Sequence, residues 1–113
     1  AGATTLFNAT IGEIASTEHG IAFITALHDE CVTIAKSEKI KVNDDDLAQQ
    51  RRFLSDKKST WSSSMRRDMV NKSKIECAHI FLELINIADK NNVECPSLKT
   101  VMINGEIYMR SLV

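Results

Sequence analysis

The sequence has little that would interrupt a helix. Its 113 residues include one proline, Pro96, and four scattered glycines. This scarcity of helix breakers, together with the near absence of strand-like alternation of β-branched residues, predicts an all-α domain with long helices. A length of 113 residues suits one domain, residues 1–113, and leaves no room for a complete two-domain enzyme.

An excess of charge of one sign is also absent. Fourteen Lys and Arg residues oppose fifteen Asp and Glu residues, which argues against a dedicated nucleic-acid partner. No apolar run approaches the ~20 residues that span a bilayer, so we expect no membrane partner. The three cysteines are an odd number without a CxxC pair, and they predict an intracellular, cytoplasmic protein. The chain begins at Ala1 rather than at methionine, so we expect a fragment or a processed form.

Apolar residues recur at helical spacing in several stretches. The predicted helices cover residues 18–40, 43–54, 65–70, 75–88 and 97–112, with Ser97 as a candidate cap and a weak point at Gly105. The serine-rich segment 57–64 is predicted to be a loop that leads into the short helix. Residues 75–88 are apolar on more than one side, so we expect them to form the central helix of the bundle.

Several pairs of reactive side chains have simpler structural explanations. His28 and Cys31 have the spacing of metal ligands, but no second pair accompanies them, so core packing is favoured and no metal site is predicted. Cys77 and His79 are two residues apart on a helix and point to different sides, which excludes a nucleophile–base pair. The basic pairs at 51–52, 57–58 and 66–67 alternate with acidic residues, as on a solvated face.

Two polar residues are better candidates for a functional site. Ser64 lies where the serine-rich loop turns into a helix, and its alternative role is that of an N-cap. Glu76 opens the most apolar helix, where the positive end of the helix dipole favours a carboxylate. Its alternative role is to form, with His79 and Glu83, the hydrated stripe of a mostly buried helix.

The order of several motifs resembles one protein family. Ser63-Ser64-Met65-Arg66-Arg67-Asp68, followed by Ile75-Glu76, resembles the S-S-M-x-x-D…[TK]-x-E signature of the C-terminal domain of ketopantoate reductase (2-dehydropantoate 2-reductase). Residues 10–14 (TIGEI), 30–40 and 92–96 (NVECP) resemble further family segments in the same order, with Asn92 at a usual glycine. The resemblance implies a helical bundle of the 6-phosphogluconate dehydrogenase C-terminal-like type.

The resemblance also implies a function. In this family an NADPH hydride reduces ketopantoate to pantoate, a step of pantothenate and coenzyme A biosynthesis. A lysine acts as the general acid, a serine and asparagines hold the substrate, and a glutamate lies beside the lysine and the nicotinamide ribose. Ser64 matches the substrate-binding serine and Glu76 the glutamate on the cofactor side. Residues 1–113 would be the substrate-binding and dimerisation domain, with the dinucleotide-binding domain absent and the fragment inactive alone.

Parts of the family pattern are missing from the sequence. Thr4-Thr5-Leu6-Phe7 occupies the place of an L-T-A-L turn, so the family's K-x-x-x-N-x-x-x-N run, which contains the general acid, falls before or at Ala1. A second alignment places Thr4 on the lysine and Asn8 on the first asparagine. Trp61 stands where some members carry a substrate-contacting asparagine, which leaves the substrate open.

Two other functions remain possible from the sequence. The chain can be a reductase domain for another 2-keto acid, with NADPH or NADH as the cofactor. It can also be a helical interaction or dimerisation module that does no chemistry. The module hypothesis predicts that Glu76 is paired with a local cation, or exposed with no cleft beside it.

Overall fold

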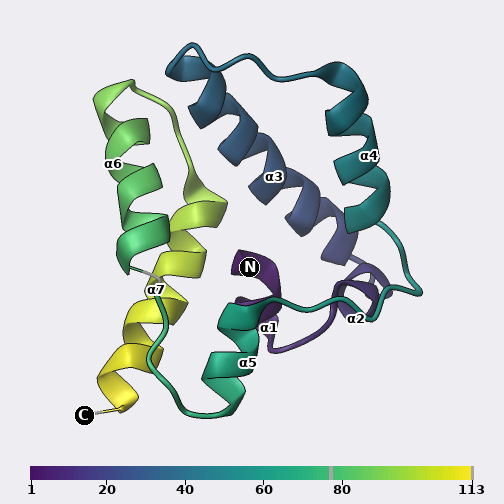
Figure 1. Cartoon of the computed structure of the whole chain (residues 1–113), viewed down its shortest axis with the longest axis vertical. Coiled ribbons are helices and arrows are strands. Elements are labelled where there is room, and N and C mark those ends of the chain that lie inside the picture. Colours follow the sequence, from purple (N-terminus) through teal and green to yellow (C-terminus); the bar gives the residue numbers. More distant parts are fainter. Residues whose placement is uncertain (77, 113) are drawn as a thin grey trace.

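The computed structural model describes residues 1–76 and 78–112, except the side chain of Ala78. The described residues form seven α-helices and one π-helical turn, and they contain no strand (Figure 1). None of the described helices is long and apolar enough to cross a membrane. The elements are α1 (Gly2–Phe7), α2 (Ile11–Ala15), α3 (Gly20–Ser37), α4 (Asp44–Leu54), α5 (Ser64–Val70), the π-helical turn η1 (Ala78–Leu82), α6 (Glu83–Lys90) and α7 (Pro96–Ser111).

Helices α3 and α7 pack against each other and make most of the contacts between helices. Helix α7 packs against α1, η1 and α3, while α3 also contacts α2, α4 and α6. Figure 1 shows α3 and α4 on one side of the molecule, α6 and α7 on the other, and the short helices α1, α2 and α5 beside them. The main core lies between α3, α5, α6 and α7, and its fully buried side chains include Ile34, Ala88, Cys95, Leu98 and Val101.

The predicted all-α class is confirmed, and four predicted helices agree with α3, α4, α5 and α7. Helix α4 begins as the sequence indicated, because the Asn43 side chain accepts hydrogen bonds from the backbone N–H groups of Asp45 and Asp46 at 2.8 and 3.2 Å. The acidic residues of its first turn face the positive end of the helix dipole. Helix α3 is shorter than residues 18–40 at both ends.

The prediction for residues 75–88 is wrong in two respects. Among the described residues, helical structure begins at Ala78, and its first turn is π-helical. The segment is also not central, because Ile80 and Leu82 are 40% and 41% exposed. Its apolar residues lie on a buried face and on an exposed face, which a sequence pattern does not distinguish from burial on all sides.

The start of α7 is capped by another helix and not by Ser97. Pro96 is the first residue of α7, and Cys95 lies at the N-cap position without a side-chain hydrogen bond. The Glu30 carboxylate on α3 accepts the Ser97 N–H at 3.1 Å and the Leu98 N–H at 2.9 Å. A carboxylate at this position satisfies two free N–H groups and interacts favourably with the helix dipole. The expectation of a Ser97 cap is therefore corrected.

Four helix ends use left-handed residues that are not glycine. Asn8, Lys39, Lys72 and Asn92 have φ angles of 49°, 60°, 57° and 57°. After α3, for example, the Lys39 N–H donates to the Lys36 carbonyl, and the next N–H, of Ile40, donates to Ala35. This is the Schellman pattern, in which glycine is the usual residue because a Cβ destabilises the left-handed conformation.

Replacing Lys39 by glycine should therefore stabilise the fold. We expect the free energy of unfolding to rise by about 0.5–1 kcal/mol, because glycine adopts this conformation without steric cost. Urea unfolding of the isolated chain measures the change. Lys39→Ala removes the same charge but keeps a Cβ, so it should give no comparable gain, and an equal gain in both variants would contradict the explanation.

Gly12 allows the loop before α5 to pass closely over α2. The N–H groups of Ile11 and Gly12 donate to the carbonyls of Trp61 and Ser59, both at 3.0 Å. A Cβ at Gly12 would lie 2.3 Å from the Ser59 carbonyl oxygen, which is closer than real Cβ atoms come. The absence of a side chain at Gly12 thus lets this loop reach the position from which α5 starts.

Candidate functional site

Ser63, and not Ser64, caps α5. The buried Ser63 hydroxyl accepts the Arg66 N–H at 3.1 Å and shares a 2.8 Å hydrogen bond with the Thr4 hydroxyl of α1. Ser64 is the first residue of the helix and is exposed. The alternative role of Ser64 as an N-cap is therefore wrong, and its hydroxyl is not committed to holding the helix.

Glu76 lies just before the helical segment that it was expected to open. Its backbone carbonyl accepts the Ile80 N–H at 3.0 Å, so it stands at the entry to η1. Its side chain is exposed, and within the described residues no ion pair within 4.0 Å and no side-chain hydrogen bond engages it. The carboxylate therefore serves neither as a helix cap nor as a partner of a local cation.

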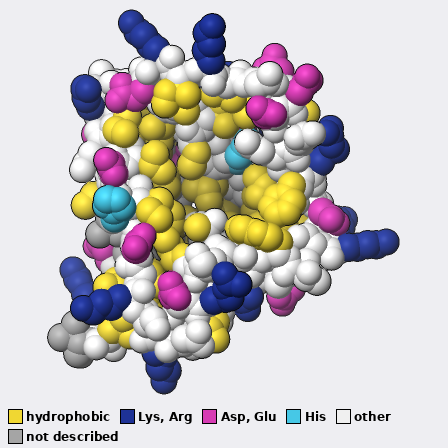
Figure 2. All heavy atoms as spheres, in the orientation of Figure 1, with side chains coloured by type: hydrophobic (Ala, Val, Ile, Leu, Met, Phe, Trp, Pro, Cys, Tyr) yellow, Lys and Arg dark blue, Asp and Glu magenta, His cyan; other side chains and the backbone are white. Residues whose placement is uncertain are grey.

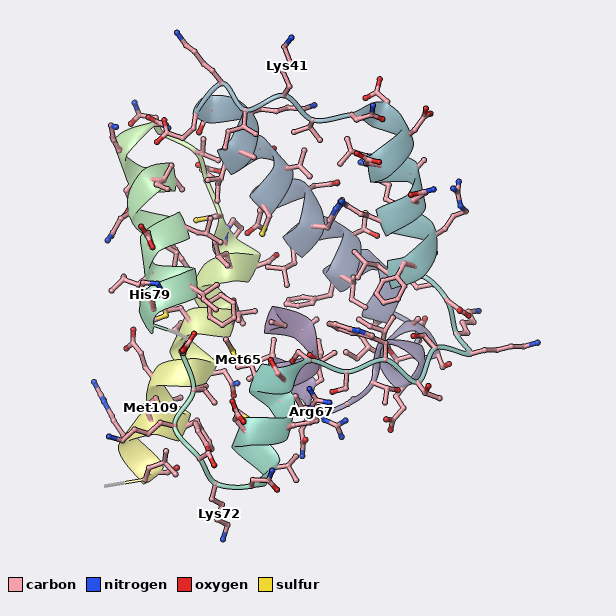
Figure 3. All side chains as sticks on the ribbon, in the orientation of Figure 1. Lys41, Met65, Arg67, Lys72, His79 and Met109 are labelled. Carbon is pink, nitrogen blue, oxygen red and sulfur yellow. The ribbon has the colours of Figure 1, made fainter. Side chains whose placement is uncertain are left out.

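The segment 73–76 that carries Glu76 is attached to α7. Ile75 is buried, and its N–H donates to the Met109 sulfur at 3.4 Å. The Tyr108 hydroxyl donates to the Ser73 carbonyl. Lys74 and Glu76 flank the buried Ile75 and are exposed, as expected for alternating side chains in a non-helical segment. Figure 3 shows Lys72, earlier in the same connection, pointing away from the molecule.

Ser64 and Glu76 line one pocket. Its volume is about 240 Å³, and it lies between the first turn of α5, which carries Met65, and η1, which carries His79 (Figure 3). The lining residues are Ser64, Met65, Asp68, Lys74, Glu76 and Ile80. A hydroxyl, two carboxylates, one ammonium group and the apolar side chains of Met65 and Ile80 thus line a small space. The module hypothesis predicted a cation-paired or exposed Glu76 with no cleft beside it; Glu76 is exposed, but the cavity beside it argues against this hypothesis.

The other residues singled out by the family pattern lie away from this pocket. Trp61 packs edge-on against Phe53, with ring centroids 5.6 Å apart. The Asn8 side chain accepts a hydrogen bond from the Arg66 guanidinium at 3.1 Å. The Thr4 hydroxyl contacts Ser63 and the Ala1 carbonyl and is fully buried. The alignment that places Thr4 on the general acid therefore gains no support from the geometry.

His28 and Cys31 are not joined by a third potential metal ligand among the described residues. The His28 ring nitrogen Nε2 shares a 2.6 Å hydrogen bond with the Gln50 side chain, and burial raises the pKa of the Cys31 thiol. No group of three or more potential ligands occurs within residues 1–76 and 78–112. Cys77, and with it the Cys77–His79 pair, lies outside the described residues.

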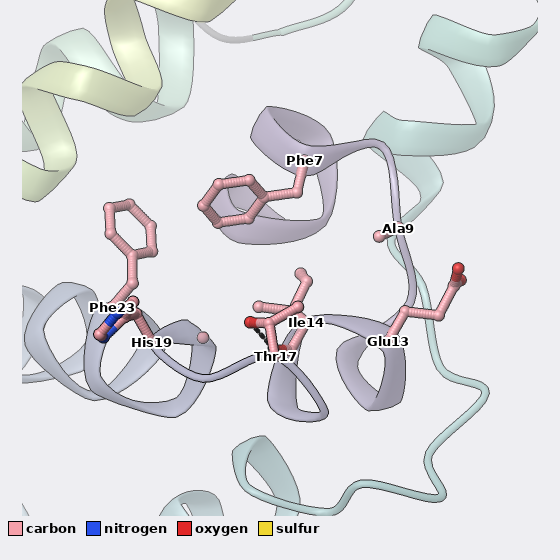
Figure 4. Close-up of a pocket in the computed structure, with 8 residues that line it drawn as sticks. Phe7, Ala9, Glu13, Ile14, Thr17, His19 and Phe23 are labelled. Carbon is pink, nitrogen blue, oxygen red and sulfur yellow. Dashed lines mark hydrogen bonds between the residues drawn. The ribbon is translucent and has the colours of Figure 1, made fainter.

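A larger cavity of about 530 Å³ was not foreseen from the sequence (Figure 4). Phe7 and Phe23 line it and contact each other edge-to-face, with ring centroids 5.2 Å apart, and Ile14 adds to the apolar lining. Its carboxylate, Glu13, accepts the Thr10 N–H in a capping box, and this hydrogen bond lowers the pKa of Glu13. In residues 10–13, Thr10 and Glu13 are thus explained by helix capping, and Gly12 by the close approach of the loop before α5.

A second apolar hollow opens at the centre of one face of the molecule. Figure 2 shows hydrophobic side chains gathered there. The hollow has a volume of about 270 Å³, and its lining includes Leu27, Cys31, Phe53, Trp61 and Leu84. Phe53 and Trp61 are each 43% exposed, so the described residues leave this apolar surface uncovered.

Solved structures share the helical fold of this chain. The chain aligns with a PanE/ApbA family ketopantoate reductase from Ralstonia eutropha JMP134 at a TM-score of 0.85 and 18% identity, over 98% of this chain and 37% of the other. A dimeric ketopantoate reductase from Staphylococcus aureus aligns at a TM-score of 0.84 and 16% identity, over 99% of this chain and 39% of the other. A D-mandelate dehydrogenase in complex with NADH and anilino(oxo)acetate aligns at a TM-score of 0.81 and 18% identity, over 98% of this chain and 47% of the other. The chain thus has the fold of a helical domain of such enzymes.

Sequence comparison identifies the family. A family model described as the C terminal of ketopantoate reductase PanE/ApbA matches residues 1–104. The chain is 32% identical over 108 residues to the uncharacterized oxidoreductase YkpB of Bacillus subtilis (strain 168), covering 96% of this chain and 36% of that protein. The chain therefore belongs to the ketopantoate reductase C-terminal domain family, as the motifs indicated, and it spans about a third of the length of this relative.

Proposed function

We propose that the chain is the substrate-binding domain of a two-domain oxidoreductase that reduces ketopantoate to pantoate with NADPH. The observation that supports this most is the single pocket that Ser64 and Glu76 share, at the spacing of the family signature. The relatives are two to three times longer than this chain, which agrees with a separate dinucleotide-binding domain in the complete polypeptide.

Within the pocket, the two residues have different roles in the proposed reaction. The neutral Ser64 hydroxyl donates a hydrogen bond to the substrate and adds no charge repulsion. The Glu76 carboxylate accepts a hydrogen bond from a ribose hydroxyl of the cofactor and orients the general-acid lysine. That lysine is expected before Ala1, so residues 1–113 alone should be inactive.

We assign only the nicotinamide end of the cofactor to this chain. Its described residues contain no strand, and the four glycines do not form the G-x-G-x-x-G turn that holds a pyrophosphate. Glu76 is exposed at the pocket, where its carboxylate oxygens can accept hydrogen bonds from hydroxyl groups. The bound cofactor would supply the hydride, and this chain would position the substrate carbonyl. We further propose a cytoplasmic homodimer, by analogy with the dimeric reductase of Staphylococcus aureus.

A second candidate function is the reduction of another 2-keto acid. It is favoured by the structural similarity to D-mandelate dehydrogenase, whose ternary complex contains an oxoacetate ligand. Trp61, which replaces a family asparagine, lies outside the pocket and does not decide between the two substrates. A panel of 2-keto acids assayed with the complete polypeptide separates them.

Replacing Ser64 by alanine tests the proposed substrate contact. We expect the KM for ketopantoate to rise by about 10-fold with a smaller change in kcat, because one hydrogen bond to the bound substrate is lost. Steady-state kinetics of the complete polypeptide measure both constants. Ser62→Ala changes a nearby serine that does not line the pocket and should leave KM unchanged. Equal KM values for Ser64→Ala and the unmodified protein would contradict the assignment.

A further inference from the structure

The pocket shared by Ser64 and Glu76 contains one cationic side chain among its lining residues. Asp68 and Glu76 each contribute a carboxylate, and Lys74 contributes an ammonium group. No ion pair within 4.0 Å joins Lys74 to either carboxylate in the described part of the chain. Without Lys74, the formal charge of the lining would change from −1 to −2, and an anionic substrate would lose its cationic partner and be repelled more strongly.

The backbone around Lys74 is held on both sides. Before it, the N–H of Ser73 donates to the Asp68 carbonyl at 2.8 Å in the Schellman end of α5, and the Ser73 carbonyl accepts the Tyr108 hydroxyl. After it, Ile75 is buried and bonded to Met109. Lys74 is therefore attached to a fixed segment, and its flexible side chain reaches the pocket from there.

We propose that Lys74 binds the carboxylate of the 2-keto acid and sets the preference for an anionic substrate. This inference rests on the proposed function, because it assigns the substrate charge at the same site. The Ser64 hydroxyl would hold a second oxygen of the substrate, and Asp68 and Glu76 would disfavour any anion that Lys74 does not neutralise. Lys74 is a binding residue in this assignment and takes no part in the transfer of hydride or proton.

The test compares a charged substrate with an uncharged analogue in the complete polypeptide. Lys74→Gln should raise the KM for ketopantoate at least about 10-fold, with kcat nearly unchanged, because binding before and during the reaction is weakened equally. The KM for ketopantoamide, in which an amide replaces the carboxylate, should change less than about 2-fold. Lys74→Arg keeps the positive charge and should retain a KM close to that of the unmodified protein.

Lys72→Gln is the matched control, because Lys72 belongs to the same connection but does not line the pocket. Equal effects of Lys74→Gln on the acid and the amide, or no effect on the acid, would overturn the inference. A raised KM for NADPH alone would also overturn it, since Lys74 would then bind a cofactor phosphate. If Ser64→Ala and Glu76→Ala also leave the kinetics unchanged, or if no 2-keto acid is reduced, the proposed function itself fails.

Discussion

Substitution of Glu76 by alanine in the complete polypeptide is expected to lower kcat/KM for ketopantoate by about 10²- to 10³-fold. The substitution removes the carboxylate that, in the proposed reaction, orients the general-acid lysine and accepts a hydrogen bond from the cofactor ribose. The folded state should be unaffected, because the Glu76 side chain is exposed and makes no hydrogen bond within the described residues. Steady-state kinetics and urea unfolding measure the two quantities separately.

The control for this prediction is Glu83→Ala. Glu83 is an exposed carboxylate seven residues after Glu76, at the first position of α6, and it lies outside the pocket. It should retain kcat/KM within about 2-fold. If both variants lose activity, the cause is the negative charge of this surface and not a specific contact of Glu76. Unchanged activity in Glu76→Ala would show that Glu76 does not belong to the site.

The largest expected loss of stability follows from Glu30→Ala. This substitution removes the acceptor of two backbone N–H groups at the start of α7, the helix that contacts α1, η1 and α3. We expect the free energy of unfolding to fall by about 2–3 kcal/mol, since hydrogen bonds to a charged acceptor contribute more than neutral ones. Urea unfolding of the isolated chain measures this change.

Glu38→Ala provides the comparison for Glu30→Ala. Glu38 lies at the end of the same helix, is exposed, and caps no other element through its side chain. Its replacement should change stability by less than about 0.5 kcal/mol. A loss in Glu30→Ala no larger than that in Glu38→Ala would show that the interhelical cap contributes little.

Local patterns in the sequence predicted most of the fold. The spacing of apolar residues located α3, α4, α5 and α7, and Asn43 marked the start of α4 correctly. These elements follow from residues close in sequence, such as a cap and the N–H groups two and three positions later. The helix-end glycine expected at position 92 is replaced by asparagine, which tolerates the left-handed conformation.

Features that depend on distant residues could not be predicted. Glu30 and Ser97 are 67 residues apart, so the cap of α7 is invisible in either segment alone. The same holds for the Thr4–Ser63 hydrogen bond, which shows that Ser63 and not Ser64 has the structural role. Ile80 and Leu82 have the composition of core residues, and only the arrangement of the other helices shows that they are exposed.

The two candidate site residues came from the sequence, whereas the pocket that they line could be described only from the structure. Ser64 and Glu76 were selected from the sequence, and they line one pocket. Lys74 stands at the [TK] position of the family signature, but the sequence alone indicated no role for it, because an exposed lysine is ordinarily solvated. In the structure, the buried Ile75 leaves its neighbours Lys74 and Glu76 exposed, and Lys74 lines the same pocket as Asp68.

The most direct measurement is NADPH oxidation in the presence of ketopantoate, made on residues 1–113 and on the complete natural polypeptide that contains them. The proposed function predicts turnover by the complete polypeptide and none by residues 1–113 alone. Turnover by residues 1–113 alone would contradict the division of roles between two domains. A folded complete polypeptide that binds NADPH and reduces no 2-keto acid would contradict the proposed function as a whole.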